Sequence, residues 1–306
     1  MFQNDPSLTL ARMAEAVLLA SLLATCQATS TFWHISDLHL DYLYAEGGDR
    51  SHWCHASNSS TTPGAGPAGD YRCDAPPPLV FSALEAMAKL EPLPDFIVWT
   101  GDSAPHWGAK DGLQPPDGSY IMNVTKRVFQ RLDDLFPGVP VVPALGNHDS
   151  SPPDQFPVET EKDRSPAYYR ELWKQGAFGD HIEEEGRETF QRCGFYTKVI
   201  DSFRFVVLNT NIYYGDDLAE GPDPCDQMDW FNSTLVRATE KVFVVAHVPP
   251  GVFERGGKEG FAINFDRPRE YSNEINKRYV SIVTESSNAE KIVAHLYGHL
   301  HTDTFR

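Results

Sequence analysis

The sequence predicts an α/β domain, and two observations carry that prediction. Short apolar runs alternate with longer amphipathic stretches, as expected when strands alternate with helices. The 306 residues are 41% hydrophobic and 23% charged, so the chain can bury a full core as one large domain or two small ones, and overall disorder is excluded. We find no internal repeat and no interdomain linker, and we therefore expect one catalytic domain over residues 29–306.

Six apolar runs are the candidate strands of this domain. They are Phe32–Ser36, Phe96–Thr100, Val139–Ala144, Phe203–Leu208, Val242–Ala246 and Ile292–Tyr297. Helices are predicted where apolar residues recur every three or four positions: over Val80–Met87, Val124–Leu135 and Asp226–Thr239. The Gly-, Pro- and Ser-rich stretch Ser51–Pro78 is predicted to be a surface loop.

The N-terminus has the pattern of a secretory signal peptide. Arg12 precedes the apolar stretch Ala16–Ala24, and small residues lead to an expected cleavage after Ala28. The alternative is a short buried helix, but the position at the chain terminus favours a signal peptide over residues 1–28. Beyond it we find no apolar run of the roughly 18 residues that a membrane span needs. We therefore expect a secreted or lysosomal protein without a transmembrane segment.

Four cysteines remain after the predicted cleavage, an even number that suits an oxidising compartment. We favour a Cys54–Cys73 bridge, which would staple the loop between them, and Cys193–Cys225 as the second pair. Four cysteines allow three connectivities, so this pairing is a preference among them. Zinc-finger spacing is absent because no CxxC occurs.

Secretion also gives meaning to three glycosylation sequons, which begin at Asn58, Asn123 and Asn232.

The charge composition restricts the classes of partner that the protein can bind. With 26 Lys+Arg against 43 Asp+Glu, the formal net charge is -17 and the pI is near 5.0. Such an acidic surface repels polyanions, which argues against a nucleic-acid polymer as partner. No sequence feature indicates an oligomeric state.

Metal-ligand residue types follow five of the six candidate strands. The set is Asp37, His39, Asp102, Asn147, His247, His299 and His301. Open α/β sheets place ligands at the carboxyl ends of their strands, so these side chains are expected to converge there. Glycines at 101, 146 and 298 are expected to let the backbone turn sharply beside them.

This donor set predicts a catalytic site with two metal ions. Mixed oxygen and nitrogen donors without thiolate favour Zn²⁺, Mn²⁺ or Fe²⁺ in a catalytic site over a closed structural zinc site. Seven candidates exceed the needs of one tetrahedral ion, and Asp102 is the natural bridging carboxylate between two. We assign one ion to Asp37, His39, Asp102 and His301, and the other to Asp102, Asn147, His247 and His299.

Each motif alone has an unremarkable interpretation. Asp-x-His is more often a turn with an exposed histidine, and Gly-Asp is often only a loop. Gly-Asn-His-Asp at 146–149 and Gly-His-x-His at 298–301 are more specific, and their order at successive strand ends argues for one site. Elsewhere, His34 and His295 are expected to be core histidines within strands, and His52, His55 and His181 to be solvated.

At these motifs the sequence resembles the calcineurin-like metallophosphoesterase superfamily. Narrower features resemble its acid sphingomyelinase-like phosphodiesterases: FWHISDLH at 32–39, TGD at 100–102 with His106, and AHVPPG at 246–251. The resemblance covers about residues 31–306. It implies a four-layer fold, a two-sheet β-sandwich flanked by helices, with a site for two zinc ions at one edge. It also implies lysosomal delivery or secretion, glycosylation and the Cys54–Cys73 disulfide.

The resemblance assigns catalytic roles to two histidines that are not ligands. His148 is the expected general acid for the leaving group, and His106 is expected to orient the phosphate. The expected reaction is attack of a metal-bridging hydroxide on the phosphorus of a small phosphodiester, nucleotide or phospholipid head group. No separate organic cofactor is indicated.

Two departures from the family pattern leave alternatives open. Only Thr29, Ser30 and Thr31 lie between the predicted cleavage and the first strand, where acid sphingomyelinase carries a lipid-presenting domain. Soluble phosphodiesters or nucleotides therefore become more attractive substrates. The chain also stops at Arg306, soon after the last motif, so we expect a C-terminally truncated second sheet. The alternatives are a phosphomonoesterase or nucleotide pyrophosphatase on the same scaffold, or a truncated non-catalytic binding protein.

Overall fold

The structure is a computed structural model that describes residues 30–56, 64–106, 114, 116–158, 166–175, 177–214, 223–251 and 271–302. The predicted signal peptide at 1–28 and the sequon residue Asn58 lie outside the described residues. The described residues from Phe32 onward belong to one compact unit.

The first sheet contains three parallel strands in the order β1-β3-β4. Their bounds are β1 Phe32–Ile35, β3 Phe96–Trp99 and β4 Val141–Pro143. The central strand β3 has the sequence FIVW, and all four residues are buried. A continuous apolar run is typical of a strand that is covered on both faces, and it fixes β3 in the middle of the sheet.

The second sheet contains four strands in the order β5-β6-β7-β8. Their bounds are β5 Tyr196–Ile200, β6 Phe203–Val207, β7 Lys241–Val245 and β8 Ile292–Leu296. Strands β5 and β6 form an antiparallel hairpin, whereas β6, β7 and β8 run parallel. The three parallel strands therefore all present their carboxyl ends at one edge.

Aromatic side chains fill the space between the two sheets. The ring of Phe96 on β3 lies 5.0 Å from that of Phe205 on β6 and 6.1 Å from that of Phe243 on β7, and Phe32 on β1 lies 5.8 Å from Phe243. Such offset and edge-to-face contacts add to the large apolar area that these residues bury. The two sheets therefore share one core.

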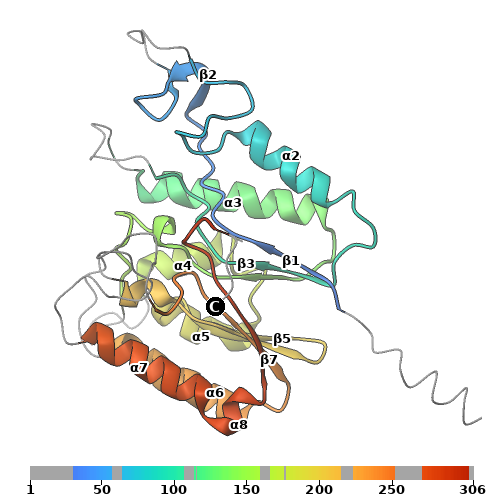
Figure 1. Cartoon of the computed structure of the whole chain (residues 1–306), viewed down its shortest axis with the longest axis vertical. Helices are drawn as coiled ribbons and strands as arrows, with labels where there is room; N and C mark the ends of the chain where they lie inside the picture. Colours follow the sequence, from blue (N-terminus) through green and yellow to red (C-terminus); the bar gives the residue numbers. More distant parts are fainter. Residues whose placement is uncertain are drawn as a thin grey trace, which may run out of the picture. The chain divides into compact units, whose positions relative to one another are not determined.

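Helices cover the outer faces of this pair of sheets (Figure 1). Those beside the first sheet are α2 Pro77–Met87 and α3 Gly118–Leu135; those beside the second are α6 Gln227–Arg237, α7 Tyr271–Thr284 and α8 Ser286–Ala289. Helices α4 Ala167–Lys174 and α5 Glu184–Cys193 pack against each other, and α5 packs on β5. The four-layer α/β fold expected from the sequence is confirmed.

Local sequence explains where the best-defined helix, α3, begins and which face it buries. Asp117 caps the helix by accepting a hydrogen bond from the Tyr120 backbone N–H at 2.8 Å. Apolar residues at spacings of three and four then face the core: Ile121, Val124, Val128, Phe129 and Leu132. The ring of Phe129 meets Trp99 of β3 at 5.7 Å, which seats the helix on the first sheet.

All six expected strands are present, each within two residues of its expected bounds. Two further strands were not expected, β2 Tyr44–Asp49 and β5, and neither were helices α4, α5, α7 and α8. Strand β5 (YTKVI) is only half-buried after its first residue, and its edge position tolerates Thr and Lys, so its apolar signal is weak. No helix in the described part of the chain is both long and apolar enough to cross a bilayer.

Two disulfide bridges are present in the structure, Cys54–Cys73 and Cys193–Cys225. This is the connectivity that the sequence analysis favoured. The first bridge lies in the excursion between β1 and α2 and closes the part of it that follows β2. The second joins the end of α5 to the short 3-10 helix η4 Pro224–Asp226.

Candidate metal centre

The two sheets bring all seven candidate ligands to one edge of the core. Asp37 and His39 follow β1, Asp102 follows β3, Asn147 follows β4, His247 follows β7, and His299 and His301 follow β8. Backbone hydrogen bonds join these strand ends: Asp37 N–H donates to Gly101 C=O at 3.0 Å, and Gly298 N–H donates to His247 C=O at 3.0 Å. The convergence thus follows from the parallel strands, whose carboxyl ends meet at one edge.

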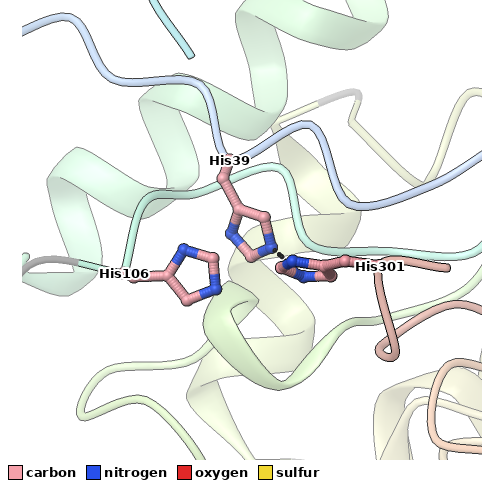
Figure 2. Close-up of side chains that lie close together, drawn as sticks. All are labelled: His39, His106 and His301. Atoms are coloured by element: carbon pink, nitrogen blue, oxygen red, sulfur yellow. Dashed lines mark hydrogen bonds between the residues drawn. The ribbon is translucent and has the colours of Figure 1, made fainter. Parts of the chain in front are cut away.

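Four of these residues form what we call the outer cluster: Asp37, His39, Asp102 and His301. The Nε2 atoms of His39 and His301 lie 2.9 Å apart; a dashed line joins the two rings in Figure 2. His39 Nε2 is 3.5 Å from Asp102 Oδ2, and His301 Nε2 is 3.3 Å from Asp37 Oδ1. Nitrogen and carboxylate oxygen donors therefore point at one small volume.

The inner cluster contains Asp102, Asn147, His247 and His299. Asn147 Oδ1 lies 2.9 Å from His247 Nε2 and 2.9 Å from His299 Nδ1. Asp102 Oδ2 lies 3.2 Å from His247 Nε2, while the same oxygen faces His39 of the outer cluster. One carboxylate oxygen is therefore shared by the two clusters.

Hydrogen bonds behind the ligands orient their donor atoms inward. His39 Nδ1 lies 2.9 Å from Ala104 C=O and His247 Nδ1 lies 2.6 Å from Thr100 C=O. A carbonyl can only accept, so both Nδ1 atoms carry the proton, and in the neutral ring the Nε2 lone pair points into the site. A metal ion would therefore bind the Nε2 atoms of His39 and His247.

The Asn147 amide is oriented in the same sense. Its Nδ2 donates to Asp154 Oδ1 at 2.8 Å, which turns Oδ1 toward the two inner histidines. An amide oxygen and a carboxylate oxygen thus lie 2.9 Å and 3.2 Å from the same histidine nitrogen, His247 Nε2. Such acceptors repel one another unless a proton or a cation lies among them. The residues therefore fit a divalent cation in each cluster.

The ionisation of the histidines divides them into two kinds. Burial lowers the pKa of His39 and of His299 to about 3, so both rings are neutral at mildly acidic pH. Burial opposes protonation of His247 too, but Asp102 and its neighbours raise that pKa to about 9. Burial likewise opposes the charge on Asp102, yet His247 keeps the Asp102 pKa well below its ordinary value. A cation that bound here would take the place of the His247 proton.

The backbone of the site is unusual. Five of the seven candidate ligands have φ between 41° and 74°: Asp37, His39, Asp102, His299 and His301. For residues other than glycine this left-handed region costs about 1–2 kcal/mol each. Clusters of such residues occur at functional sites, where the surrounding structure holds them in place.

Two of the glycines beside the ligands provide space rather than a turn. Gly101 does turn, with φ at 97°. A Cβ at Gly146 would lie 2.2 Å from Asp102 Oδ1, and one at Gly298 would lie 2.7 Å from Asp37 Oδ2. The expectation of a sharp turn is therefore right for Gly101 only, and the other two let the backbone approach the carboxylates closely.

The two histidines expected to be catalytic lie beside the outer cluster. The His106 ring stacks on His39 with centroids 3.6 Å apart, and the His148 ring is 4.4 Å from His106. Figure 2 shows His106 next to His39 and His301. The His148 N–H donates to Asp102 Oδ1 at 2.8 Å, and its Nδ1 is buried without a hydrogen-bond partner among the described residues. The protein thus leaves this buried ring nitrogen at the edge of the site without a partner among the described residues.

Asp149 was expected from the sequence to orient a histidine or a loop backbone, and the structure shows it bonded to loop backbone. Two other supporting residues, Asp74 and Asp154, were missed by the sequence analysis. Asp154 orients Asn147, and Asp74 bonds both the ring and the backbone of His106. Asp149 accepts from the backbone N–H groups of Asp102, Ser103 and Gly146 at 2.8–2.9 Å. The only signal in the sequence for Asp74 and Asp154 is that both are acidic. An acidic residue type alone does not distinguish a supporting partner from a solvated carboxylate.

Other sequence expectations have mixed outcomes. Asn123 and Asn232 are exposed, but both lie on helices, α3 and α6. His34 and His295 lie in strands as expected but are exposed, so the expectation of core histidines is wrong. His52 is exposed, whereas His181 is buried and His55 pairs with buried Asp41 at 2.6 Å. The exposure of these histidines depends on tertiary packing, which their local sequence does not reveal.

The sequence matches the calcineurin-like phosphoesterase family model over residues 30–303. Acid sphingomyelinase-like phosphodiesterase 3b of Mus musculus is 35% identical over 288 residues, which cover 90% of this chain and 58% of that protein. Cyclic GMP-AMP phosphodiesterase SMPDL3A of Rattus norvegicus is 35% identical over 289 residues, covering 90% and 59%. Sphingomyelinase phosphodiesterase C of Dictyostelium discoideum is 35% identical over 288 residues, covering 90% and 58%. The chain thus spans somewhat more than half the length of these relatives.

Proposed function

Because the chain belongs to the calcineurin-like phosphoesterase family, we propose that it is a hydrolase of small phosphodiesters that uses two divalent metal ions. The observation that carries the proposal is the shared Asp102 Oδ2, which faces His39 at 3.5 Å in one cluster and His247 at 3.2 Å in the other. A carboxylate between two converging donor sets is the arrangement that a two-ion site requires. Zinc suits the histidine, carboxylate and amide donors.

The outer cluster would hold one ion and the inner cluster the other, with Asp102 common to both. Ions bound there supply Lewis acidity, which activates water and neutralises negative charge on the phosphoryl oxygens. The protein contributes the fixed orientation of its donors. Ala104 and Thr100 carbonyls hold the two proton-bearing Nδ1 atoms, and Asp154 holds the Asn147 amide. The donors therefore need little rearrangement on binding, which is how a preorganised site lowers a barrier.

His148 is our candidate general acid for the leaving alkoxide. Its backbone N–H is fixed on Asp102 Oδ1, which ties the residue to the shared carboxylate. Burial lowers the pKa of His148 to about 4. The protonated fraction therefore grows as the pH falls toward 4, which favours an acidic working range. His106, with its ring against His39, is the candidate for orienting the phosphate.

The substrate class follows from the relatives and from charge. The three relatives are named for sphingomyelin-type and cyclic GMP-AMP phosphodiester substrates. A formal net charge of -17 disfavours a long polyanion, so a small phosphodiester, a nucleotide or a phospholipid head group is the better fit. We place the protein outside the cell or in the lysosome, where its disulfides would persist and Asn58, Asn123 and Asn232 could carry glycans.

Hydrolysis of bis(p-nitrophenyl) phosphate tests the proposal. The chain, expressed through the secretory pathway, purified and supplied with Zn²⁺, should hydrolyse this diester faster than the monoester p-nitrophenyl phosphate. The matched control is Asp102→Asn, which keeps the size of the side chain but removes its charge. Faster monoester hydrolysis would favour a phosphomonoesterase, and folded protein without metal-dependent turnover would refute the enzyme assignment for this chain.

A further inference from the structure

His106 is held by two residues that each adjoin a cysteine of the same disulfide. Asp74, directly after Cys73, accepts from the His106 ring Nδ1 at 2.7 Å through Oδ1 and from its backbone N–H at 2.6 Å through Oδ2. Both carboxylate oxygens are thus committed to one histidine. Because the carboxylate accepts, Nδ1 of His106 carries the proton and Nε2 is left for the site.

Trp53, directly before Cys54, provides the second contact. Its ring lies nearly parallel to that of His106, with centroids 6.3 Å apart and planes 13° apart. Trp53 and Cys54 have φ values of 56° and 59°. A left-handed conformation at two consecutive residues other than glycine is unfavourable, so the surrounding structure must impose it.

The disulfide and its backbone contacts impose this conformation. Cys54 is fully buried and its Cα lies 5.9 Å from that of Cys73. Cys54 N–H donates to Asp49 C=O at 2.8 Å and Cys54 C=O accepts from Ala45 N–H at 2.9 Å. On the other side of the bridge, Ala75 N–H donates to His39 C=O at 3.1 Å. The bridge therefore joins the segment with Trp53 to a segment bonded to a candidate ligand.

The second disulfide differs in its surroundings. Cys193 and Cys225 pack with Phe195 and against Trp230, beside helices α5 and α6. No contact between this bridge and His106 occurs in the described part of the chain. It closes a longer loop, with a sequence separation of 32 against 19, and provides a control bridge that does not contact His106.

We propose that the Cys54–Cys73 disulfide, through Asp74 and Trp53, positions the His106 ring for the reaction. This inference rests on the proposed phosphodiesterase function and assigns Asp74 and Trp53 as positioning residues. Breaking the bridge releases both contacts on His106 together, because each contact is adjacent to one of its cysteines. The bonds within the inner cluster involve neither cysteine, so the inner metal site should persist.

A double-mutant cycle tests the proposal. Cys54→Ser/Cys73→Ser should lower kcat for bis(p-nitrophenyl) phosphate by about 10- to 100-fold, the scale expected when a reacting group is displaced by about 1 Å. In a His106→Ala background the same change should lower kcat by less than about threefold, because the group being positioned is already gone. Cys193→Ser/Cys225→Ser should leave kcat within about threefold of wild type. Metal content should stay at the wild-type value in all variants.

A second readout does not depend on turnover. The Nδ1 proton of His106 should give a downfield imidazole NMR resonance that His106→Ala removes. Asp74→Ala and Trp53→Leu keep both cysteines and allow for failure of the bridge variant to fold. The first should abolish the resonance and the second should shift or broaden it, as should loss of the bridge.

Three results would overturn the proposal: an equal fall of kcat in the wild-type and His106→Ala backgrounds, metal loss with the bridge, or an unchanged resonance when the bridge is absent. If wild type lacks all turnover, the phosphodiesterase assignment fails. The resonance would still show whether the bridge holds His106.

Discussion

The inner and outer clusters share Asp102 but differ in how firmly the protein holds their donors. In the inner cluster His247 is fully buried and Asn147 is 4% exposed, and each is fixed by a hydrogen bond, to Thr100 C=O and to Asp154. In the outer cluster the side chain of His301 is 46% exposed and lies five residues beyond the end of β8. A preorganised donor set loses less conformational freedom when it binds. We therefore expect tighter binding of an ion in the inner cluster, and substrate access at the outer one.

Removal of the shared ligand Asp102 should impair metal binding in both clusters. Asp102→Ala is expected to release both ions and to lower turnover by about 10⁴-fold or more, because the ions contribute several kcal/mol at about 1.4 kcal/mol per factor of ten. Metal analysis by mass spectrometry after gel filtration, together with diester hydrolysis, measures both effects. Retention of two ions would show that Asp102 does not bridge them.

His148→Ala should slow turnover without changing metal binding in either cluster. We expect turnover to fall roughly 10²- to 10⁴-fold while metal content stays constant, the usual scale for general acid catalysis. His148→Gln is the matched control, since it keeps a polar side chain but cannot act as the acid. The assignment fails if an activated leaving group and a poor one are slowed equally, because an acid matters most for the poor one.

Asp154→Ala should weaken only the inner site. Without its acceptor, the Asn147 amide can rotate and present Nδ2 to the histidines, so the affinity for one ion should fall about 10- to 100-fold. Isothermal titration of the metal-free protein should resolve this loss, with His301→Ala as the counterpart for the outer site. Equal weakening of both ions by Asp154→Ala would contradict the separation of the clusters.

The pH dependence of stability gives the smallest and most specific effect. In metal-free protein the pKa of His247 is about 9, above the ordinary value of 6.5. Its contribution to folding is fully present below pH 6.5 and is lost as the pH rises through 9, a change on the order of 3 kcal/mol. Metal-loaded protein should show the opposite trend, since protons compete with the ion. Thermal melts at pH 6.5 and 9, with and without chelator, provide the comparison.

The melts should also be recorded for His247→Gln. This variant should lose most of the decline between the two pH values in the metal-free state. An undiminished decline would mean that another group is responsible for the pH dependence.

The buried strands could be predicted because their physical signal is local. FIVW at Phe96–Trp99 and FVV at 205–207 are apolar throughout, and a strand covered on both faces requires no more. The meeting of the candidate ligands could also be predicted, since parallel strands end side by side. The structure brings those residues together; their binding of metal stays a prediction.

The remainder depends on contacts between distant residues. Asp74 contacts His106 across 32 positions, and half-buried His55 contacts buried Asp41 across 14 positions. His181 lies in a polar stretch but is buried beside Phe129 of α3. In the edge strand β5 only the first side chain is buried and the others are half-buried, so its hydrophobic pattern is weak. These features are set by which distant residues or strands lie next to each other in the fold, and local composition does not show this.

The left-handed backbone at Asp37, His39, Asp102, His299 and His301 has a consequence for stability and activity. Glycine would adopt these φ values without the roughly 1–2 kcal/mol that other residues incur. Substitutions that inactivate the site could therefore make the fold more stable, as in other proteins where activity and stability oppose each other. Substitution of one of these residues by glycine would therefore relieve backbone strain and remove a candidate metal ligand at the same time.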